Sequence, residues 1–353
     1  MMHSVLSDDG WDYSFLSTSL DELDRLIAFY RRGGFDFVKA RELAETRRRS
    51  VCLTFDDGFC DNWTLLHPFL AQRKIPYTVF VNRDFVEKTD TVREWADRTP
   101  GYLSIGELKR MHESGLCDLQ SHSATHTWYP IAGRVVDVFK PGDKAKYPWM
   151  GWNDQPRLKP YWLQADYSHL VGLPVFENDR SLRARRFVFD ADKLAHFQGQ
   201  VQADRLDADA ANELLVREYP DIGRAETPAE RQARYVAEIR DNAEFIREVL
   251  GYHPSVMCWP GGAFNDESEA LAQRFHDCTT IKRGYGADRR FMHRLSPSNP
   301  YGRDRFPWKH FRLTLLGYTV RHAAGYLAGR ARACGGLLPG GKARSAAVAE
   351  VSA

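Results

Sequence analysis

The residues best suited to chemistry are an adjacent pair of carboxylates, Asp56 and Asp57, and a pair of histidines, His122 and His126. Each pair follows a short run of strand-forming residues. A carboxylate and two imidazoles are ligands that zinc and similar divalent ions accept, and three protein ligands leave positions for water and substrate. The second carboxylate could then accept a proton from metal-bound water. The combination predicts a metal-dependent hydrolase.

Each pair alone is weak evidence. An Asp-Asp-Gly sequence is most often a solvated turn, and an isolated His-x3-His is most often two ordinary surface or capping histidines. The combination favours a metal site because the pairs follow the strand-like runs 51–55 and 117–120. In parallel α/β folds the catalytic residues collect where strands end.

The elements that position these residues alternate between strand and helix. Strand-like runs lie at 51–55, 77–81, 117–120 and 255–259, and helical spacing of apolar residues lies at 20–32, 63–73, 104–114, 208–218, 228–250 and 268–275. This alternation predicts an α/β fold with a parallel sheet or barrel.

The stretch 130–225 interrupts the alternation and is predicted to be a long insertion or lid. Its aromatic residues suit either stacking on sugar faces or a small core of the insertion's own. They are Trp128, Tyr129, Trp149, Trp152, Tyr161 and Trp162. Its basic residues either meet an anionic group or are simply solvated. They are Lys140, Lys144, Lys146, Arg157 and Lys159.

The composition indicates which partners and which cellular compartment to expect. The 353 residues carry a net charge of only +2, which gives no reason to expect nucleic acid as a partner. The six cysteines are scattered without a CxxC pair, which favours a reducing compartment. We see neither a secretory leader nor a run of 18 apolar residues, so we expect a cytoplasmic protein.

Three motifs resemble those of the polysaccharide deacetylases (carbohydrate esterase family four, with NodB homology). Thr54–Gly58 and His122–His126 resemble the family's first two motifs, and Trp259–Asn265 resembles the third. Met2–Val5 is similar to the opening of many members. The resemblance implies an irregular (β/α) barrel with the long insertion after the second motif.

The resemblance covers roughly residues 1–130 and 228–296, and it implies a role for each matching residue. Asp56 would be the general base. The metal ligands would be Asp57, His122 and His126. The backbone N–H of Gly261 would help to hold the oxyanion. The metal would be Zn²⁺, with Co²⁺, Ni²⁺, Fe²⁺ or Mn²⁺ as alternatives.

The chain departs from the family pattern in three ways. Cys258 stands where the third motif often has an arginine that orients the base, and we hypothesise that Arg294 supplies that guanidinium. Gly261 replaces a tyrosine of the third motif. The late histidine motif that supplies the general acid is not clear. His293 is the first candidate and His310 the second, although a lone late histidine is also commonly structural.

The predicted organisation is a barrel over 1–300, with the insertion at 130–225 inside it, a basic helical extension over 301–334, and a disordered tail over 335–353. The helix predicted at 311–333 either packs on the barrel or lies on an anionic membrane face. The second interpretation would place the protein at the inner face of the membrane.

The function predicted from these features is removal of an N-acetyl group from an amino sugar. The sugar would belong to a cell-envelope polysaccharide or a lipid-linked glycan precursor. Two other classes remain open. One is a carbohydrate-binding pseudoenzyme, which the missing motif arginine favours and the intact Asp56, Asp57, His122 and His126 oppose. The other is an amidase or deformylase acting on a small amide.

Overall fold

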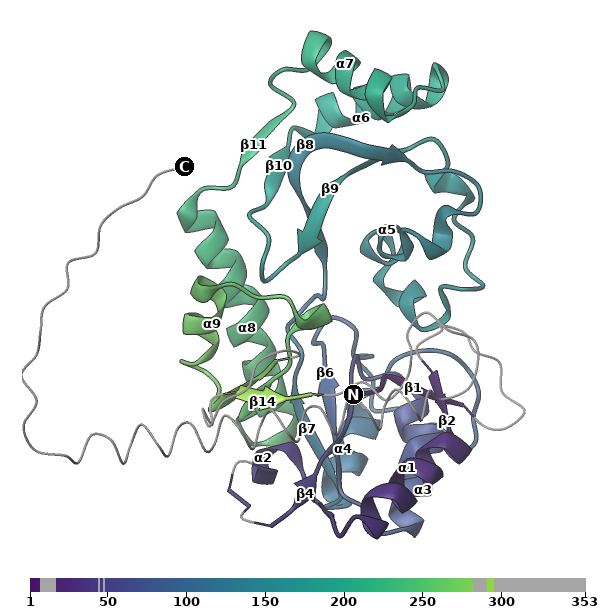
Figure 1. The fold of residues 1–353 in the computed structure, drawn as a ribbon, viewed down its shortest axis with the longest axis vertical. Coiled ribbons are helices and arrows are strands. Elements are labelled where there is room, and N and C mark those ends of the chain that lie inside the picture. The colour runs from purple at the N-terminus through teal and green to yellow at the C-terminus, as the bar shows by residue number, and fades with distance from the viewer. Residues whose placement is uncertain (7–16, 44, 47, 282–290, 295–353) are drawn as a thin grey trace, which may run out of the picture.

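The fold is built on a six-stranded parallel sheet (Figure 1). The computed structural model describes residues 1–6, 17–43, 45–46, 48–281 and 291–294. In spatial order the strands are β14 (Phe291–His293), β13 (Cys278–Ile281), β12 (Val256–Met257), β7 (Cys117–Ser121), β6 (Tyr77–Val81) and β5 (Leu53–Phe55). This order follows the chain order without reversal, so the sheet winds in one direction, as a barrel does. The predicted α/β fold with a parallel sheet is confirmed.

Helices surround the sheet and close its main core. They are α1 (Leu20–Arg32), η1 (Asn62–Leu66), α3 (His67–Gln72), α4 (Ile105–Glu113), α8 (Pro228–Leu250) and α9 (Asp266–Ala272). The largest apolar cluster joins β5, β6 and β7 to α1, α4 and the last turns of α8. Burial of this apolar surface fixes the strands whose ends carry the two predicted motifs.

The longest helix, α8, has clear sequence signals at both ends. Thr227 and Glu230 form a reciprocal capping box at its start, and Gly251 ends it in a left-handed conformation, with φ of 78°. The predicted range of 228–250 is confirmed. Its buried face is mostly apolar but also includes the polar residues Glu238 and Asn242.

Several predicted elements differ in detail. The strand expected over 255–259 is only β12 (Val256–Met257). The strand expected over 51–55 is divided at Cys52, because β4 (Ser50–Val51) pairs with β3 (Asp36–Phe37) in a separate sheet. The helix expected over 63–73 opens with the π-helical turn η1. The helix expected over 268–275 begins earlier, because Asn265 caps it through Ser268.

Short elements precede and flank the first sheet strand. They are β1 (Ser4–Leu6), β2 (Ser17–Ser19) and α2 (Ala40–Leu43). Met2 pairs in parallel with Phe55, and its N–H donates to the carbonyl of Thr54 at 2.8 Å. The N-terminal segment therefore runs along β5 and brings His3 to the end of that strand.

Residues 128–225 form a layer of their own above the sheet, at the top of Figure 1. Its strands and helices are β8 (Trp128–Val138), η2 (Asp143–Ala145), α5 (Pro148–Asp154), η3 (Pro156–Tyr161), η4 (Ser168–Leu170), β9 (Pro174–Arg180), β10 (Phe187–Phe189), α6 (Ala191–Ala203), α7 (Ala208–Glu218) and β11 (Gly223–Ala225). Only α7 was predicted. The long strand β8 escaped prediction because its pairing with β9 shifts register twice, which breaks the simple alternation of buried and exposed residues.

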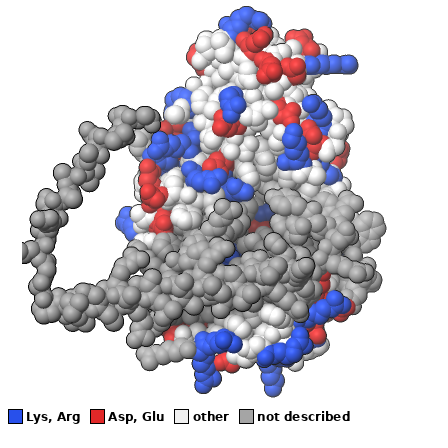
Figure 2. All heavy atoms as spheres, viewed as in Figure 1, with Lys and Arg blue, Asp and Glu red and all other residues white. Residues whose placement is uncertain are grey.

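Acidic and basic side chains are interspersed over the described surface of the view in Figure 2, in keeping with the small net charge. Within the described residues no helix is long and apolar enough to cross a membrane. The predicted helix at 311–333, the extension 301–334, the tail 335–353 and His310 lie outside the described residues.

We predict that His276, in the turn between α9 and β13, makes stability depend on pH. Burial lowers its pKa to about 3, against about 6.5 for an unfolded histidine. Between these values the unfolded chain binds a proton that the folded chain does not, so stability falls as pH drops below about 6.5, by up to about 1.4 kcal/mol per pH unit. In urea unfolding at pH 7.5 and 5, His276→Gln should lose less stability than the wild type.

His196→Gln is the matched control, since His196 is exposed on α6. It should behave like the wild type. An equal loss in His276→Gln and the wild type would contradict the prediction.

Candidate active site

The two predicted motifs lie together at the carboxyl ends of β5 and β7. Asp56 and Asp57 follow the last residue of β5, and His122 follows the last residue of β7, with β6 between the two strands. Asp57 and His126 both have left-handed backbones, with φ of 71° and 54°. Such conformations are uncommon outside glycine and persist only where the surroundings enforce them.

Asp57 faces both imidazoles. Its Oδ1 lies 3.6 Å from Nε2 of His122 and 3.5 Å from Nε2 of His126. These three residues form a buried group whose ligand atoms lie within 4.8 Å of one another. The carboxylate and two imidazole nitrogens match the donor set of a catalytic zinc site.

The hydrogen bonding of Asp57 also fits a metal ligand. Asp57 is 1% exposed, and within the described part of the chain neither of its carboxylate oxygens accepts a hydrogen bond. Burial of a charge is costly unless a cation or strong donors compensate it. In this structure the ammonium of Lys159, 2.8 Å from Oδ1, is such a cation. A divalent ion bound by Asp57, His122 and His126 would provide that compensation in its place.

The charge state of His126 suits ligation. Burial, reinforced by the nearby ammonium of Lys159, holds the pKa of His126 well below its usual value. The ring is therefore neutral at neutral pH, and the neutral ring is the form that binds metals.

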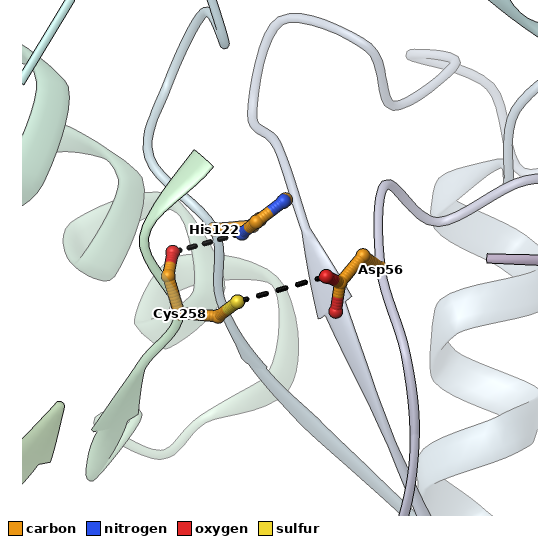
Figure 3. A group of neighbouring side chains, drawn as sticks. All are labelled: Asp56, His122 and Cys258. Carbon is orange, nitrogen blue, oxygen red and sulfur yellow. Dashed lines mark hydrogen bonds between the residues drawn. The ribbon is translucent and has the colours of Figure 1, made fainter. Parts of the chain in front are cut away.

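His122 is held in one orientation by the next strand of the sheet. Its Nδ1 lies 2.8 Å from the carbonyl oxygen of Cys258, directly after β12 (Figure 3). A carbonyl only accepts, so Nδ1 donates and Nε2 is the nitrogen left for a metal. Figure 3 shows that second nitrogen directed away from Cys258. It lies 3.6 Å from Oδ1 of Asp57. Although burial alone would lower it, Cys258 and the carboxylate of Asp56 raise the pKa of His122 to about 9, so an ion on Nε2 must displace a proton at neutral pH. Such outer bonds set the tautomer and orientation of metal ligands.

Asp56 has different partners from its neighbour. Nη2 of Arg294 donates to Oδ1 of Asp56 at 2.5 Å and to the hydroxyl of Thr54 at 3.1 Å. Burial alone would raise the pKa of Asp56, but the Arg294 guanidinium outweighs it and holds the pKa well below its usual range. Arg294 thus occupies the place that the sequence hypothesis gave it, just after β14.

A second group of potential ligands consists of Asp56, His122 and Cys258. The Cys258 thiol donates to Asp56 Oδ2 at 3.7 Å, as Figure 3 shows. Arg294 donates to both Cys258 and Asp56, so this group already contains a buried positive charge. Repulsion from that guanidinium disfavours a metal there, and the group around Asp57 is the better site.

Helix α8 binds the loop that carries both histidines (residues 122–126, the histidine loop) through two polar side chains, which together form a clamp. Glu238 accepts from the backbone N–H groups of Ala124 and Thr125, at 3.1 and 3.0 Å, and from the Thr125 hydroxyl. One turn later, Asn242 donates to the Ser121 hydroxyl at 2.9 Å. The sequence prediction missed this clamp. The available signal was a pair of polar residues, four apart, on the buried face of an otherwise apolar stripe.

Gly261 lies in a short turn after β12, η5 (Pro260–Gly262), with a left-handed φ of 59°. A Cβ atom there would collide with the side chain of Arg180, which belongs to the insertion. The left-handed conformation therefore favours glycine, and a larger residue would also have to displace the Arg180 side chain. The structure places Gly261 three residues beyond the Cys258 carbonyl that holds His122.

His293 is the last residue of β14, where it pairs with Ile281. It precedes Arg294, whose guanidinium binds Asp56. The side chain of His293 lies outside the described part of the structure, so its role as general acid stays a prediction.

Two residues without a predicted role here also reach the site. Nε2 of His3 lies 3.9 Å from Oδ2 of Asp56. Nζ of Lys159 lies 2.8 Å from Oδ1 of Asp57 and is almost fully buried. Of the two interpretations given for the basic residues of the insertion, Lys159 fits the first, because its ammonium meets an anionic group, the carboxylate of Asp57. The sequence did not identify Asp57 as its partner, because the insertion around Lys159 lacks periodicity.

The aromatic residues of the insertion pack mainly on one another. Trp149 stacks on Trp128 with ring centres 5.7 Å apart, and Trp152 meets Trp162 edge to face at 6.2 Å. Trp149 and Tyr161 also pack against a buried cluster of the insertion. Of the two interpretations left open by the sequence, these contacts favour a core of the insertion's own.

Residues 44–143 match the family model for polysaccharide deacetylase. The matched segment includes both carboxylates and both histidines of the site. The resemblance predicted from the motifs is confirmed, and so is the enzyme class, a hydrolase of the polysaccharide deacetylase type. No curated protein matches the chain.

The chain is similar in structure to solved deacetylases, and one of these similarities supports the fold. A de-N-acetylase from Aggregatibacter actinomycetemcomitans aligns with a TM-score of 0.56 at 15% identity, covering 88% of this chain and 97% of that one. The BpsB deacetylase domain from Bordetella bronchiseptica aligns with a TM-score of 0.48 at 17% identity, covering 83% and 94%. At such identity the first of these shows a shared fold, and the predicted deacetylase-type barrel is confirmed.

We predict that Glu238→Ala weakens metal binding although Glu238 touches no ligand atom. The change leaves two buried N–H groups of the histidine loop without their acceptor, and loss of comparable outer contacts lowers metal affinity about 10- to 100-fold. Zinc competition against a chromophoric chelator would measure the change. Glu248→Ala, on the exposed face of the same helix, should leave affinity unchanged. Equal affinities for the two folded variants would refute the clamp.

Proposed function

We propose that this chain removes an N-acetyl group from an amino sugar, using water, a divalent metal and Asp56 as the general base. One observation carries the proposal: the two adjacent carboxylates have separate partners. Asp57 faces two imidazoles at 3.5–3.6 Å, whereas Asp56 is paired with a guanidinium at 2.5 Å. Amide hydrolysis by metal-activated water needs this division between a ligand and a base.

A divalent ion held by Asp57, His122 and His126 would polarise the acetamide carbonyl and lower the pKa of a bound water to about 7. Asp56 is ionised and oriented by Arg294, so it can accept the proton of the attacking water. The N–H of Gly261 is our candidate to stabilise the oxyanion that forms as water attacks. The proton required by the departing amine is assigned to His293, as predicted from the sequence.

The insertion bears on the size of the substrate. Its residue Lys159 reaches Asp57, and its residue Arg180 covers Gly261. A site covered from two directions is hard for the middle of a long polymer to enter. It favours a sugar at a chain end or on a small carrier. Hydrolysis of a small amide other than an acetylated sugar is therefore the second candidate.

We predict that metal binding and turnover can be separated by substitution. Asp56→Asn should keep stoichiometric metal but lose about 10²- to 10⁴-fold in turnover, the contribution typical of general base catalysis. His126→Ala should lose both metal and turnover, because it removes a ligand. Elemental analysis and acetate release from an acetylated chitooligosaccharide measure the two properties.

Wild-type turnover in Asp56→Asn would remove Asp56 from the role of base. Wild-type metal content in His126→Ala would show that the metal lies elsewhere. Metal without acetate release in the wild type would favour the second candidate substrate class.

A further inference from the structure

Lys159 comes from the insertion but ends at the ligand atoms of the metal site. It lies in η3, and its Nζ is 2.8 Å from Oδ1 of Asp57 and 3.3 Å from Nε2 of His126. The residue is 3% exposed. Its ammonium also lies within 6 Å of the centres of two aromatic rings, those of Phe85 and Trp152.

An ammonium at this position and a metal on the same ligands cannot coexist. Zinc binds carboxylate oxygen and imidazole nitrogen at about 2.0–2.2 Å. The two atoms that the Lys159 ammonium contacts, Oδ1 of Asp57 and Nε2 of His126, belong to two of the three residues that would hold the ion. In a buried site, where charges are poorly screened, two cations sharing these atoms repel strongly.

The ammonium also compensates the buried negative charge of Asp57, as a bound metal would. Asp57 is buried, and the positive charge of Lys159 is the main partner that opposes the cost of burying it and lowers its pKa. Removal of one partner from a buried ion pair is normally strongly destabilising. Lys159 can therefore stabilise the arrangement of ligands before a metal binds.

The backbone that carries Lys159 is tied to the barrel. The hydroxyl of Tyr102 donates to the carbonyl of Pro156 at 3.1 Å, and two prolines, Pro156 and Pro160, restrict η3. The lysine is thus delivered to Asp57 by a defined segment of the insertion. Its long side chain can still withdraw, because four rotatable bonds separate the ammonium from this backbone.

We propose that Lys159 is an internal cation that competes with the metal for Asp57 and His126, so that the insertion sets the metal affinity of the site. The proposal rests on the metal site of the proposed function. A metal binds only when the ammonium leaves, and the observed affinity is the intrinsic affinity reduced by this competition.

Lys159→Met tests the proposal, because methionine fills similar space without the charge. Isothermal titration of zinc into metal-free protein should show affinity raised by about tenfold or more, the scale on which neighbours of metal ligands alter binding. Thermal unfolding should show a lower Tm than the wild type without zinc, and a larger rise on zinc addition. Lys159→Arg, which keeps a positive charge, should not gain affinity.

Lys146→Met is the matched control, since Lys146 is an exposed lysine of the same insertion paired with Asp137. It should bind zinc as the wild type does. Unchanged or weaker zinc binding by Lys159→Met would overturn the proposal. If Lys159→Met folds only with zinc, the proposal stands, and if zinc does not rescue its folding, the proposal falls.

The two proposals fail differently. Absence of zinc binding in the wild type, in Lys146→Met and in Lys159→Met would remove the metal site and the proposed function with it. If the wild type binds zinc and Lys159→Met binds it no more tightly, only the proposed competition by Lys159 is refuted, and the metal site stands.

Discussion

The buried negative charge of Asp57 is the constraint on which the rest of the site depends. It follows β5, the last strand of the six-stranded sheet, and neither of its oxygens accepts a hydrogen bond within the described residues. The two nearby imidazoles are suited to share a metal with it, and the Lys159 ammonium already provides a positive charge. The histidine loop places two imidazoles next to this carboxylate, and the insertion places the Lys159 ammonium there.

The parallel sheet makes that arrangement possible. Strand β5 delivers the carboxylates, β7 the histidines, β12 the carbonyl that orients His122, and β14 the guanidinium that orients Asp56. Four strands that are far apart in the sequence thus contribute to one edge. Because α8 packs behind β7, its Glu238 and Asn242 can hold the loop that carries both histidines.

The sequence predicted the parts of this protein that local patterns encode. The periodicity and caps of α8, the buried strand β6 and the two motifs at strand ends were all visible, and the family match confirms the resemblance that they carried. Arg294 could be proposed as a replacement for the missing motif arginine, since it lies on the last predicted strand and could supply the guanidinium from there.

Other parts depend on contacts between distant segments. Lys159 is a lysine in an irregular stretch, and only the folded insertion brings it to Asp57. Glu238 resembles any helical glutamate until the helix is seen to bury it against the histidine loop. Strand β8 was hidden because its irregular register with β9 removes the alternation that marks a strand.

The central claim is that Asp57, His122 and His126 hold the metal, and X-ray absorption at the zinc edge of the zinc-loaded wild-type protein tests it most directly. We expect a first shell of nitrogen and oxygen alone, at about 2.0–2.2 Å. A sulfur ligand at about 2.3 Å would instead place the metal on Cys258, in the group with Asp56 and His122, and would contradict the account.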